Sequence, residues 1–347
     1  MYKTTPLAAA LLLVASGNLM ANEHLAEIEQ SGTNNTAEQI QSGALQRSFI
    51  VQNGTENNAL TDQSGSSGEG SQASIEQSGT LNSAAIYQVH GSRPGLASAA
   101  VYQTGSSNSA HIEQQESLGE LSATATVSQQ GSGNQLDATQ TWVGNELNVV
   151  SAGQDNTVTI DQSGFSTANV QQSGVANQVQ LEQVSFGIGG GFAVIEQDGT
   201  ANQADIYQSS GRYPAGDVFL QQLGTANIAQ IRAGDGYSTL DYTQRGTGNE
   251  LNAHFSGQGS RISGYSEGSY NLVDIAQAGD DNSLDVAQVG SYNQIDAYQG
   301  FHVHEAFISQ TGDNNQAFLR QETLSYDNAS ASIIQNGSGN IASVVQQ

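Results

Sequence analysis

Residues 191–208 read GFAVIEQDGTANQADIYQ and contain the unit from which nearly the whole chain is built. Two seven-residue segments, 191–197 and 202–208, alternate between small or apolar residues and polar ones, which is typical of β-strands. The connection Gln197-Asp-Gly-Thr-Ala-Asn202 carries a glycine two residues after the first segment. Glycine adopts positive φ at low cost, so this connection predicts a tight turn. The unit is therefore a strand, a turn and a second strand.

The unit repeats along the chain as 28 segments in 14 pairs, from a first segment ending at Gln30 to a last ending at Gln346. Asparagine opens the second strand of every pair, from Asn35 to Asn340. The turn glycine is present in every pair, as Gly32, Gly54, Gly79, Gly105, Gly131, Gly153, Gly174, Gly199, Gly224, Gly246, Gly268, Gly290, Gly312 and Gly337. The connection within a pair keeps one length, whereas the connection between pairs varies.

Insertions confined to one of two corners are typical of stacked solenoids. We therefore predict an all-β, amyloid-like β-solenoid of about 14 two-strand rungs, with two parallel sheets facing each other. The predicted domain spans residues 22–347.

The period of two sends Asn202, Ala204, Ile206 and Gln208 to the inside and the alternate residues to the surface. A buried amide is costly unless its donors and acceptors are satisfied. Stacking in register allows each amide to donate to the same amide one rung on, as in cross-β assemblies. The predicted ladder residues include Gln30, Asn35, Gln77, Asn82, Gln103, Asn108, Gln172, Asn177, Gln197, Asn202, Gln288, Asn293, Gln335 and Asn340.

Six positions depart from the pattern. Serine replaces the ladder glutamine at Ser151 and Ser266, and Ala233 and Phe255 replace it in second strands. Gln39 and Thr61 occupy inward positions where apolar residues are expected. Departures concentrate between Ala233 and Ser266, so we expect the weakest stacking there.

The first 21 residues have the features of a secretory signal peptide. Lys3 precedes the apolar run LAAALLLV at 7–14, and Leu19-Met-Ala21 offers a cleavage site. The run is too short to span a bilayer. The alternative is a buried N-terminal helix, but the polar repeats that follow leave it nothing to pack on. We expect the mature chain to be secreted.

Composition excludes several classes of function. The chain has 33 Asp and Glu against 8 Lys and Arg, a net charge of −25, and no Cys. Nucleic-acid binding requires basic patches, and disulfide scaffolds and thiolate metal sites require cysteine.

The segments SQASIEQSGTLNSAAIYQ at 71–88 and STANVQQSGVANQVQLEQ at 166–183 follow the frame S-x5-Q-x-G-x2-N-x5-Q. This frame resembles the repeat of the curlins, the subunits of bacterial curli. The resemblance covers about residues 24–346 and implies an extracellular fibre subunit for biofilm matrix, adhesion and surface attachment. It implies as partners other copies of the chain, other curlin subunits, and curli secretion and nucleation components.

The chain has more repeats than familiar major curlins and lacks their glycine-rich segment before the first repeat. Whether it is a major subunit or a nucleator stays open.

Candidate chemistry is sparse. Gly264-Tyr-Ser266-Glu-Gly268 matches G-x-S-x-G but straddles a strand end and a turn rather than a nucleophile elbow. His302 and His304 form a histidine pair that we interpret as solvated rather than metal-binding. Gly279-Asp-Asp-Asn282 and Gly234-Asp-Gly236 weakly resemble calcium-binding nonapeptides, and diffuse Ca²⁺ binding to the carboxylates stays open. We predict no catalytic residues, no cofactor and no dedicated metal site.

The sequence pattern permits functions of three different classes. We expect a polymerising structural subunit, because neither end of the repeat array shows a helix or a polar cap. The alternative is a monomeric secreted β-solenoid, acting as an adhesin or as a calcium- or ice-binding surface module. A polysaccharide-acting enzyme on a β-helix is disfavoured, because these rungs are too small to present a broad cluster of carboxylates.

Overall fold

The computed structural model describes residues 23–65, 70–90, 97–116, 122–186, 189–322 and 328–347. The predicted signal peptide lies outside these residues. The chain divides into two compact units, Met1–Asp155 and Asn156–Gln347, called here unit 1 and unit 2. No helix of the described residues has the length and apolar character needed to cross a bilayer.

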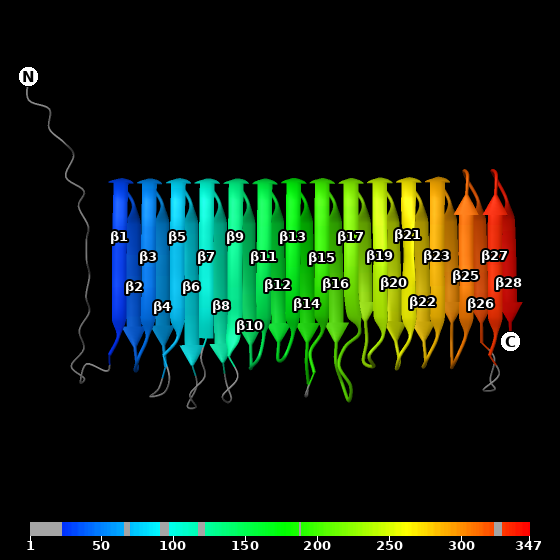
Figure 1. Ribbon diagram of the computed structural model, residues 1–347, viewed down its shortest axis with the longest axis horizontal. Helices are drawn as coiled ribbons and strands as arrows, with labels where there is room; N and C mark the ends of the chain where they lie inside the picture. Colours follow the sequence, from blue (N-terminus) through cyan, green and yellow to red (C-terminus); the bar gives the residue numbers. More distant parts are fainter. Residues whose placement is uncertain (1–22, 66–69, 91–96, 117–121, 187–188, 323–327) are drawn as a thin grey trace, which may run out of the picture. The chain divides into compact units, whose positions relative to one another are not determined.

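Unit 1 contains two parallel sheets (Figure 1). Sheet A holds the odd-numbered strands β1 (Leu25–Thr33), β3 (Arg47–Thr55), β5 (Gln72–Thr80), β7 (Ala97–Ser106), β9 (Ala123–Ser132) and β11 (Glu146–Gln154). Sheet B holds the even-numbered strands β2 (Thr36–Ser42), β4 (Asn58–Ser64), β6 (Ser83–His90), β8 (Ser109–Glu116) and β10 (Gln135–Thr141). An odd strand, its turn and the following even strand make one rung.

Unit 2 repeats this organisation. Its sheet A strands are β13 (Thr167–Val175), β15 (Phe192–Thr200), β17 (Asp217–Thr225), β19 (Thr239–Thr247), β21 (Arg261–Ser269), β23 (Ser283–Ser291), β25 (Glu305–Thr311) and β27 (Ser330–Asn336). Its sheet B strands are β12 (Thr157–Ser163), β14 (Gln178–Val184), β16 (Gln203–Ser209), β18 (Ile228–Ala233), β20 (Glu250–Ser256), β22 (Leu272–Ala278), β24 (Gln294–Gln299), β26 (Gln316–Gln321) and β28 (Ile341–Gln346). Counted over the described residues, 14 strands belong to each sheet. The predicted all-β solenoid of about 14 rungs is confirmed.

The two sheets of each unit face each other across a thin core. The alternation predicted for residues 202–208 is observed, with Asn202, Ala204, Ile206 and Gln208 buried. A small and a branched side chain therefore alternate on the inward face of this strand, whereas β12 buries two branched ones, Val158 and Ile160. At Thr61 the core holds a hydroxyl instead of an apolar group, and its Oγ1 lies 2.6 Å from the Oγ of Ser48 in the facing sheet. This polar position is tolerated because the two hydroxyls satisfy each other.

Pairing between rungs continues past the predicted strand ends and into the turns. Ser173, Gly174 and Val175 pair with Asp198, Gly199 and Thr200 of the next rung. Twelve of the odd strands therefore end three residues later than the sequence pattern indicates, because the turns themselves stack in register, whereas β25 and β27 end one residue later. The tight turns of each unit collect along one edge, and the other connections along the opposite edge (Figure 1).

Each turn has a second residue with positive φ, immediately before the ladder asparagine. In eleven rungs it is not glycine, and its φ is between +54° and +58°. Such a conformation costs an L-residue about 1–2 kcal/mol. Its backbone N–H donates to the preceding rung, as from Ala201 to the oxygen of Val175 at 2.9 Å. Stacking therefore holds a conformation that the residue alone would avoid.

Between Ala233 and Ser266, where the sequence predicts the weakest stacking, the register runs without interruption. Large and small side chains compensate each other between neighbouring rungs. Tyr242 is fully buried and pairs with Gly264, and a Cβ at Gly264 would lie 2.9 Å from the Tyr242 ring. Phe255 likewise pairs with Ala233 in the neighbouring rung. The unusual residues are therefore complementary pairs that preserve the core volume.

We predict that Tyr242→Leu and Gly264→Val are each destabilising and that the double variant loses less than the sum. Tyr242→Leu leaves a void, and Gly264→Val overpacks at roughly 1–3 kcal/mol against both the Tyr242 ring and the Val286 backbone oxygen, which would lie 2.5 Å from its Cβ. Tyr242→Leu relieves the contact with the ring but not that with Val286, so a coupling of about 0.5–3 kcal/mol is expected from denaturant unfolding of the soluble chain. Strictly additive free energies would contradict the volume compensation.

Candidate functional site: the amide ladders and the open edges

Glutamine side chains form a ladder along each sheet. In sheet A of unit 1, the Nε2 of Gln77 donates to the Oε1 of Gln103 at 2.8 Å, and Gln103 donates to Gln129 at the same distance. In unit 2, Gln172 donates to Gln197 at 2.9 Å, and Gln197 to Gln222 at 2.7 Å. Every donor points toward the C-terminal rung.

The same amides also join the two sheets. The second N–H of Gln77 donates across the core to the backbone oxygen of Asn58 in sheet B at 2.9 Å. In the opposite direction, Gln88 of sheet B donates to the oxygen of Gln72 in sheet A, also at 2.9 Å. Glutamines such as Gln77 and Gln88 therefore use both N–H groups and accept through Oε1 from the preceding rung, which explains why a polar side chain is stable in this core. Gln277 is an exception, because Phe255 lies one rung earlier and the buried Gln277 Oε1 has no donor among the described residues.

The asparagine ladder runs with the opposite polarity. The Oδ1 of Asn177 accepts both the backbone N–H and the Nδ2 of Asn202, at 3.1 Å each. The sequence-based rule that each amide donates to the next rung is therefore wrong for asparagine, which donates to the preceding one. The reason is that the short side chain must also reach the turn, where the Nδ2 of Asn202 bonds to the Gly224 oxygen at 3.1 Å.

All fourteen predicted ladder residues lie in these chains of bonds. The structure places in them Gln30, Asn35, Gln77, Asn82, Gln103, Asn108, Gln172, Asn177, Gln197, Asn202, Gln288, Asn293, Gln335 and Asn340. The ladder of sheet B is interrupted at Ala233 and Phe255, which have no amide. In sheet A, Ser266 Oγ bridges Tyr242 Oη and Gln288 Oε1, at 2.8 and 3.0 Å. This buried serine is thus a ladder element.

The turn glycines are constrained in two ways. All fourteen have φ between +104° and +129°. In addition, a Cβ at Gly199 would lie 2.0 Å from the backbone oxygen of Gly224 on the next rung. Gly337 of the last rung differs, because the nearest atom to its Cβ position is the Nδ2 of Asn340 at 3.7 Å. A side chain at the other turns would therefore prevent the rungs from approaching.

The prediction of a solvated histidine pair is wrong for His304, whereas His302 is half-exposed. His304 is only 1% exposed, and neither ring nitrogen has a hydrogen-bond partner among the described residues. Its backbone instead continues the rung-to-rung network, with its N–H donating to Asn282 Oδ1 at 2.9 Å. Burial lowers the pKa of the His304 imidazole. The ring lies inside because the residue occupies a corner column that faces the core, where Asn282 lies one rung earlier.

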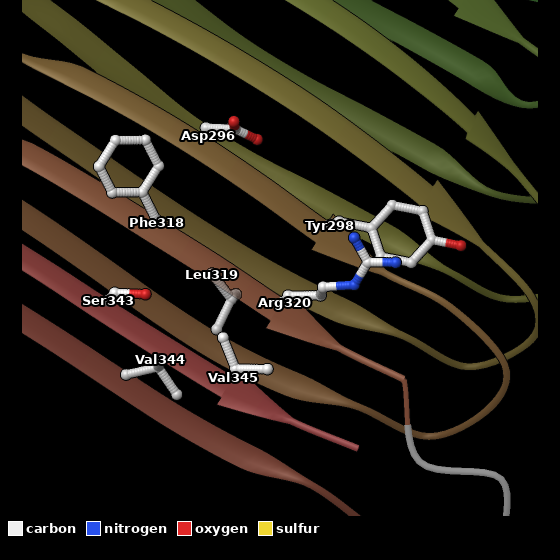
Figure 2. A pocket seen from close by; sticks show the side chains of 8 residues that line it. All are labelled: Asp296, Tyr298, Phe318, Leu319, Arg320, Ser343, Val344 and Val345. Atoms are coloured by element: carbon white, nitrogen blue, oxygen red, sulfur yellow. The ribbon is translucent and has the colours of Figure 1, made fainter.

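A shallow groove of about 160 Å³ crosses the outward face of sheet B near its last strands (Figure 2). Tyr298 and Phe318 contribute aromatic rings and Asp296 a carboxylate. The Arg320 guanidinium lies 5.4 Å from the Tyr298 ring centroid and makes two 2.8 Å bonds to Glu322. The groove offers stacking and hydrogen bonding but no activated nucleophile.

Carboxylates recur on the outward face. Asp274 and Asp296 pair directly on adjacent strands. Burial, followed by repulsion from Asp296 and Glu250, raises the pKa of Asp274. Within the described part of the chain, no three His, Asp or Glu side chains form a group that could hold a metal ion.

A family model of the curlin associated repeat matches residues 279–322, which contain strands β23 to β26. This match confirms the resemblance to curlin repeats in that part of the chain. No curated protein matches the sequence. The repeat and the β-solenoid fold together indicate a curli-like or other repeat surface protein.

We predict that Asn202→Ala is strongly destabilising, whereas Gln203→Ala on the outward face changes the unfolding free energy by less than about 0.5 kcal/mol. Loss of the Asn202 amide removes the acceptor of the Asn227 backbone N–H, one of the acceptors of the Asn227 Nδ2, and the side-chain donor to the Gly224 oxygen. Each buried group left unsatisfied costs roughly 1–3 kcal/mol. Denaturant unfolding of the two variants measures the difference. Equal losses would mean that the inward and outward faces are exchanged.

The buried His304 predicts a pH effect on the last rungs. Because its folded pKa lies below the unfolded value of about 6.5, the neutral ring contributes stability above that pH, and this stability is lost as pH falls through the lowered pKa. We expect weaker amide-exchange protection in β25 at about pH 5 than at pH 7.5, and less loss in His304→Asn. His302→Asn is the control for the half-exposed neighbour, which lies 3.6 Å from Asp280. Identical pH profiles for wild type and His304→Asn would contradict the effect.

Proposed function

We propose that the chain is an extracellular structural subunit that polymerises into curli-like amyloid fibres. In such a fibre, the last rung of one copy would pair with the first rung of the next. The biological role we propose is that of a biofilm matrix and adhesion fibre. The observation that carries the proposal is the complementary hydrogen-bonding pattern of the two end rungs.

The last rung presents two donors and one acceptor. The Nε2 of Gln335 and that of Gln346 each bond to one backbone oxygen, in Gln316 and Ser330, at 3.0 Å. Interior glutamines donate a second bond to the following rung, and within the described residues Gln335 and Gln346 have no such acceptor. The Oδ1 of Asn340 likewise lacks the donors that the Oδ1 of Asn315 receives.

The first rung presents the complementary groups. The Oε1 atoms of Gln30 and Gln41 have no donor among the described residues, although their Nε2 atoms bond forward to Gln52 and Gln63 at 2.6 and 3.0 Å. Among the described residues, no rung before the first supplies a ladder asparagine that could accept from Asn35. Gln335 and Gln346 of one copy can therefore donate to Gln30 and Gln41 of another, while Asn340 accepts from Asn35. An unpaired strand edge of this kind favours pairing with another chain.

A second candidate is a monomeric adhesin, favoured by the groove around Tyr298 and Arg320. Aromatic rings beside charged groups on a flat sheet can bind an extended partner without polymerisation. A soluble, monomeric chain with a cooperative unfolding transition would favour this alternative.

We expect the chain without residues 1–21 to form thioflavin-positive, SDS-resistant fibres with a diffraction spacing of about 4.7 Å. Ile341→Pro should slow fibre elongation strongly. Gln316 N–H donates to the Asn340 oxygen at 2.8 Å, and the equivalent N–H of Ile341 has no acceptor among the described residues. Proline at this first strand residue therefore removes a donor needed only by an added rung.

The matched control is Ile341→Thr, which removes the exposed apolar side chain, 72% accessible, but keeps the N–H. Elongation rates are compared by thioflavin fluorescence with seeded samples. If Ile341→Pro elongates like wild type, this edge is not the growing surface. Absence of fibres from wild type would contradict polymerisation itself.

A further inference from the structure

Two tyrosines lie stacked on consecutive turns of unit 2. Tyr270 and Tyr292 precede the ladder asparagines of their rungs, at the position where φ is positive. Their ring centroids are 5.3 Å apart and the ring planes differ by 16°. They are 53% and 59% exposed. The pair is therefore held in contact and yet is open to solvent.

The fold determines this stack. Tyr270 and Tyr292 have nearly the same φ, +55° and +58°, so their side chains leave the backbone in the same direction. Their N–H groups bond to Thr247 and Ser269 of the preceding rungs at 2.9 Å. Rungs in a parallel sheet repeat at roughly 4.8 Å, which matches the ring separation. Gly248 makes room for the first ring, since a Cβ there would lie 2.7 Å from the Tyr270 Cε1.

We propose that Tyr270 and Tyr292 form an oxidative cross-linking site that yields dityrosine. The oxidant is hydrogen peroxide used by a haem peroxidase. Each phenol loses one electron and one proton to give a tyrosyl radical. The two radicals join through the ring carbons ortho to oxygen, and tautomerisation restores both aromatic rings. Two tyrosines and one hydrogen peroxide thus give one dityrosine and two waters.

Comparison with the other tyrosines of the chain favours Tyr270 and Tyr292 as the cross-linking site. The chain has no cysteine, so no disulfide can tie its rungs together. Tyr242 is buried, and Tyr265 and Tyr298 have no tyrosine neighbour among the described ring contacts. The other contacting pair, Tyr213 and Tyr237, is more distant at 5.9 Å and tilted by 51°. A radical on Tyr270 therefore has its best-placed partner on the next rung.

The product would be a covalent tie between adjacent rungs. It would link residues 22 positions apart in the chain, where only non-covalent stacking otherwise joins the turns. A cross-link of this kind restricts the unfolded chain much as a disulfide does. The inference applies to a monomer as well as to a fibre, so its test does not depend on polymerisation.

The test treats the soluble full chain with a haem peroxidase and hydrogen peroxide. Trypsin cleaves after Arg261 and Arg320, so both tyrosines stay on the peptide 262–320. We expect this peptide to lose two hydrogen atoms, with the link mapped to Tyr270 and Tyr292 by a second protease. Dityrosine released by hydrolysis should fall severalfold in Tyr292→Phe and in Tyr270→Phe, which keep the stacked rings. An intrachain link should form with a yield independent of protein concentration.

Tyr265→Phe and Tyr298→Phe are the matched controls, because they remove an exposed and a half-buried tyrosine from the same peptide. Neither should lower the dityrosine yield. Oxidation in denaturant should abolish the preference for the pair. A link that maps mainly to Tyr213 and Tyr237, an equal loss in the controls, or a product made only of joined copies would overturn the proposal.

Discussion

The structure depends on how closely the backbones of neighbouring rungs approach at the turn. At twelve of the turn glycines, a Cβ would lie between 1.9 and 2.2 Å from the backbone oxygen of the next rung. No side chain fits in that space, so glycine is required by stacking as well as by its φ. The close approach brings turn onto turn and places each asparagine within reach of the asparagine on the neighbouring rung. The asparagine ladder is therefore a consequence of the turn.

Alternating interior side chains give these ladders their specificity. Hydrophobic burial alone would tolerate a slip of two residues, because such a shift keeps the same set of side chains on the inward face. The glutamines at the strand ends bond both to the next rung and across the core, as Gln77 does to Gln103 and Asn58. A slip would leave these buried groups unpaired, and each would cost roughly 1–3 kcal/mol. The polar interior thus fixes the register that the apolar interior leaves weakly specified.

Repetition made much of this architecture predictable from the sequence. Strands, turn glycines and inward amides recur at fixed positions in each repeat. A repeat whose sequence is ambiguous can therefore be assigned by alignment with the others. The polarity of the asparagine ladder was not predictable, because it depends on which atoms the Asn202 amide reaches in the turn. The positive φ of residues such as Ala201 could not be predicted from the sequence, because the residue type at this turn position differs from rung to rung. The pairing of Tyr242 with Gly264 could have been found by comparing adjacent repeats, whereas the buried ring of His304 could not.

The opposite polarities of the two kinds of ladder affect the electrostatics of each unit. Glutamine carbonyls point toward the preceding rung, and asparagine carbonyls toward the following one, as in Gln197 and Asn177. Aligned amide dipoles add up along a stack, as peptide dipoles do along a helix. Here the amide dipoles of the two glutamine ladders point in one direction and those of the asparagine ladder point in the other. The partial charges at the ends of a stack therefore partly cancel. A longer array of rungs therefore need not accumulate the end charge that a single set of parallel amides would produce.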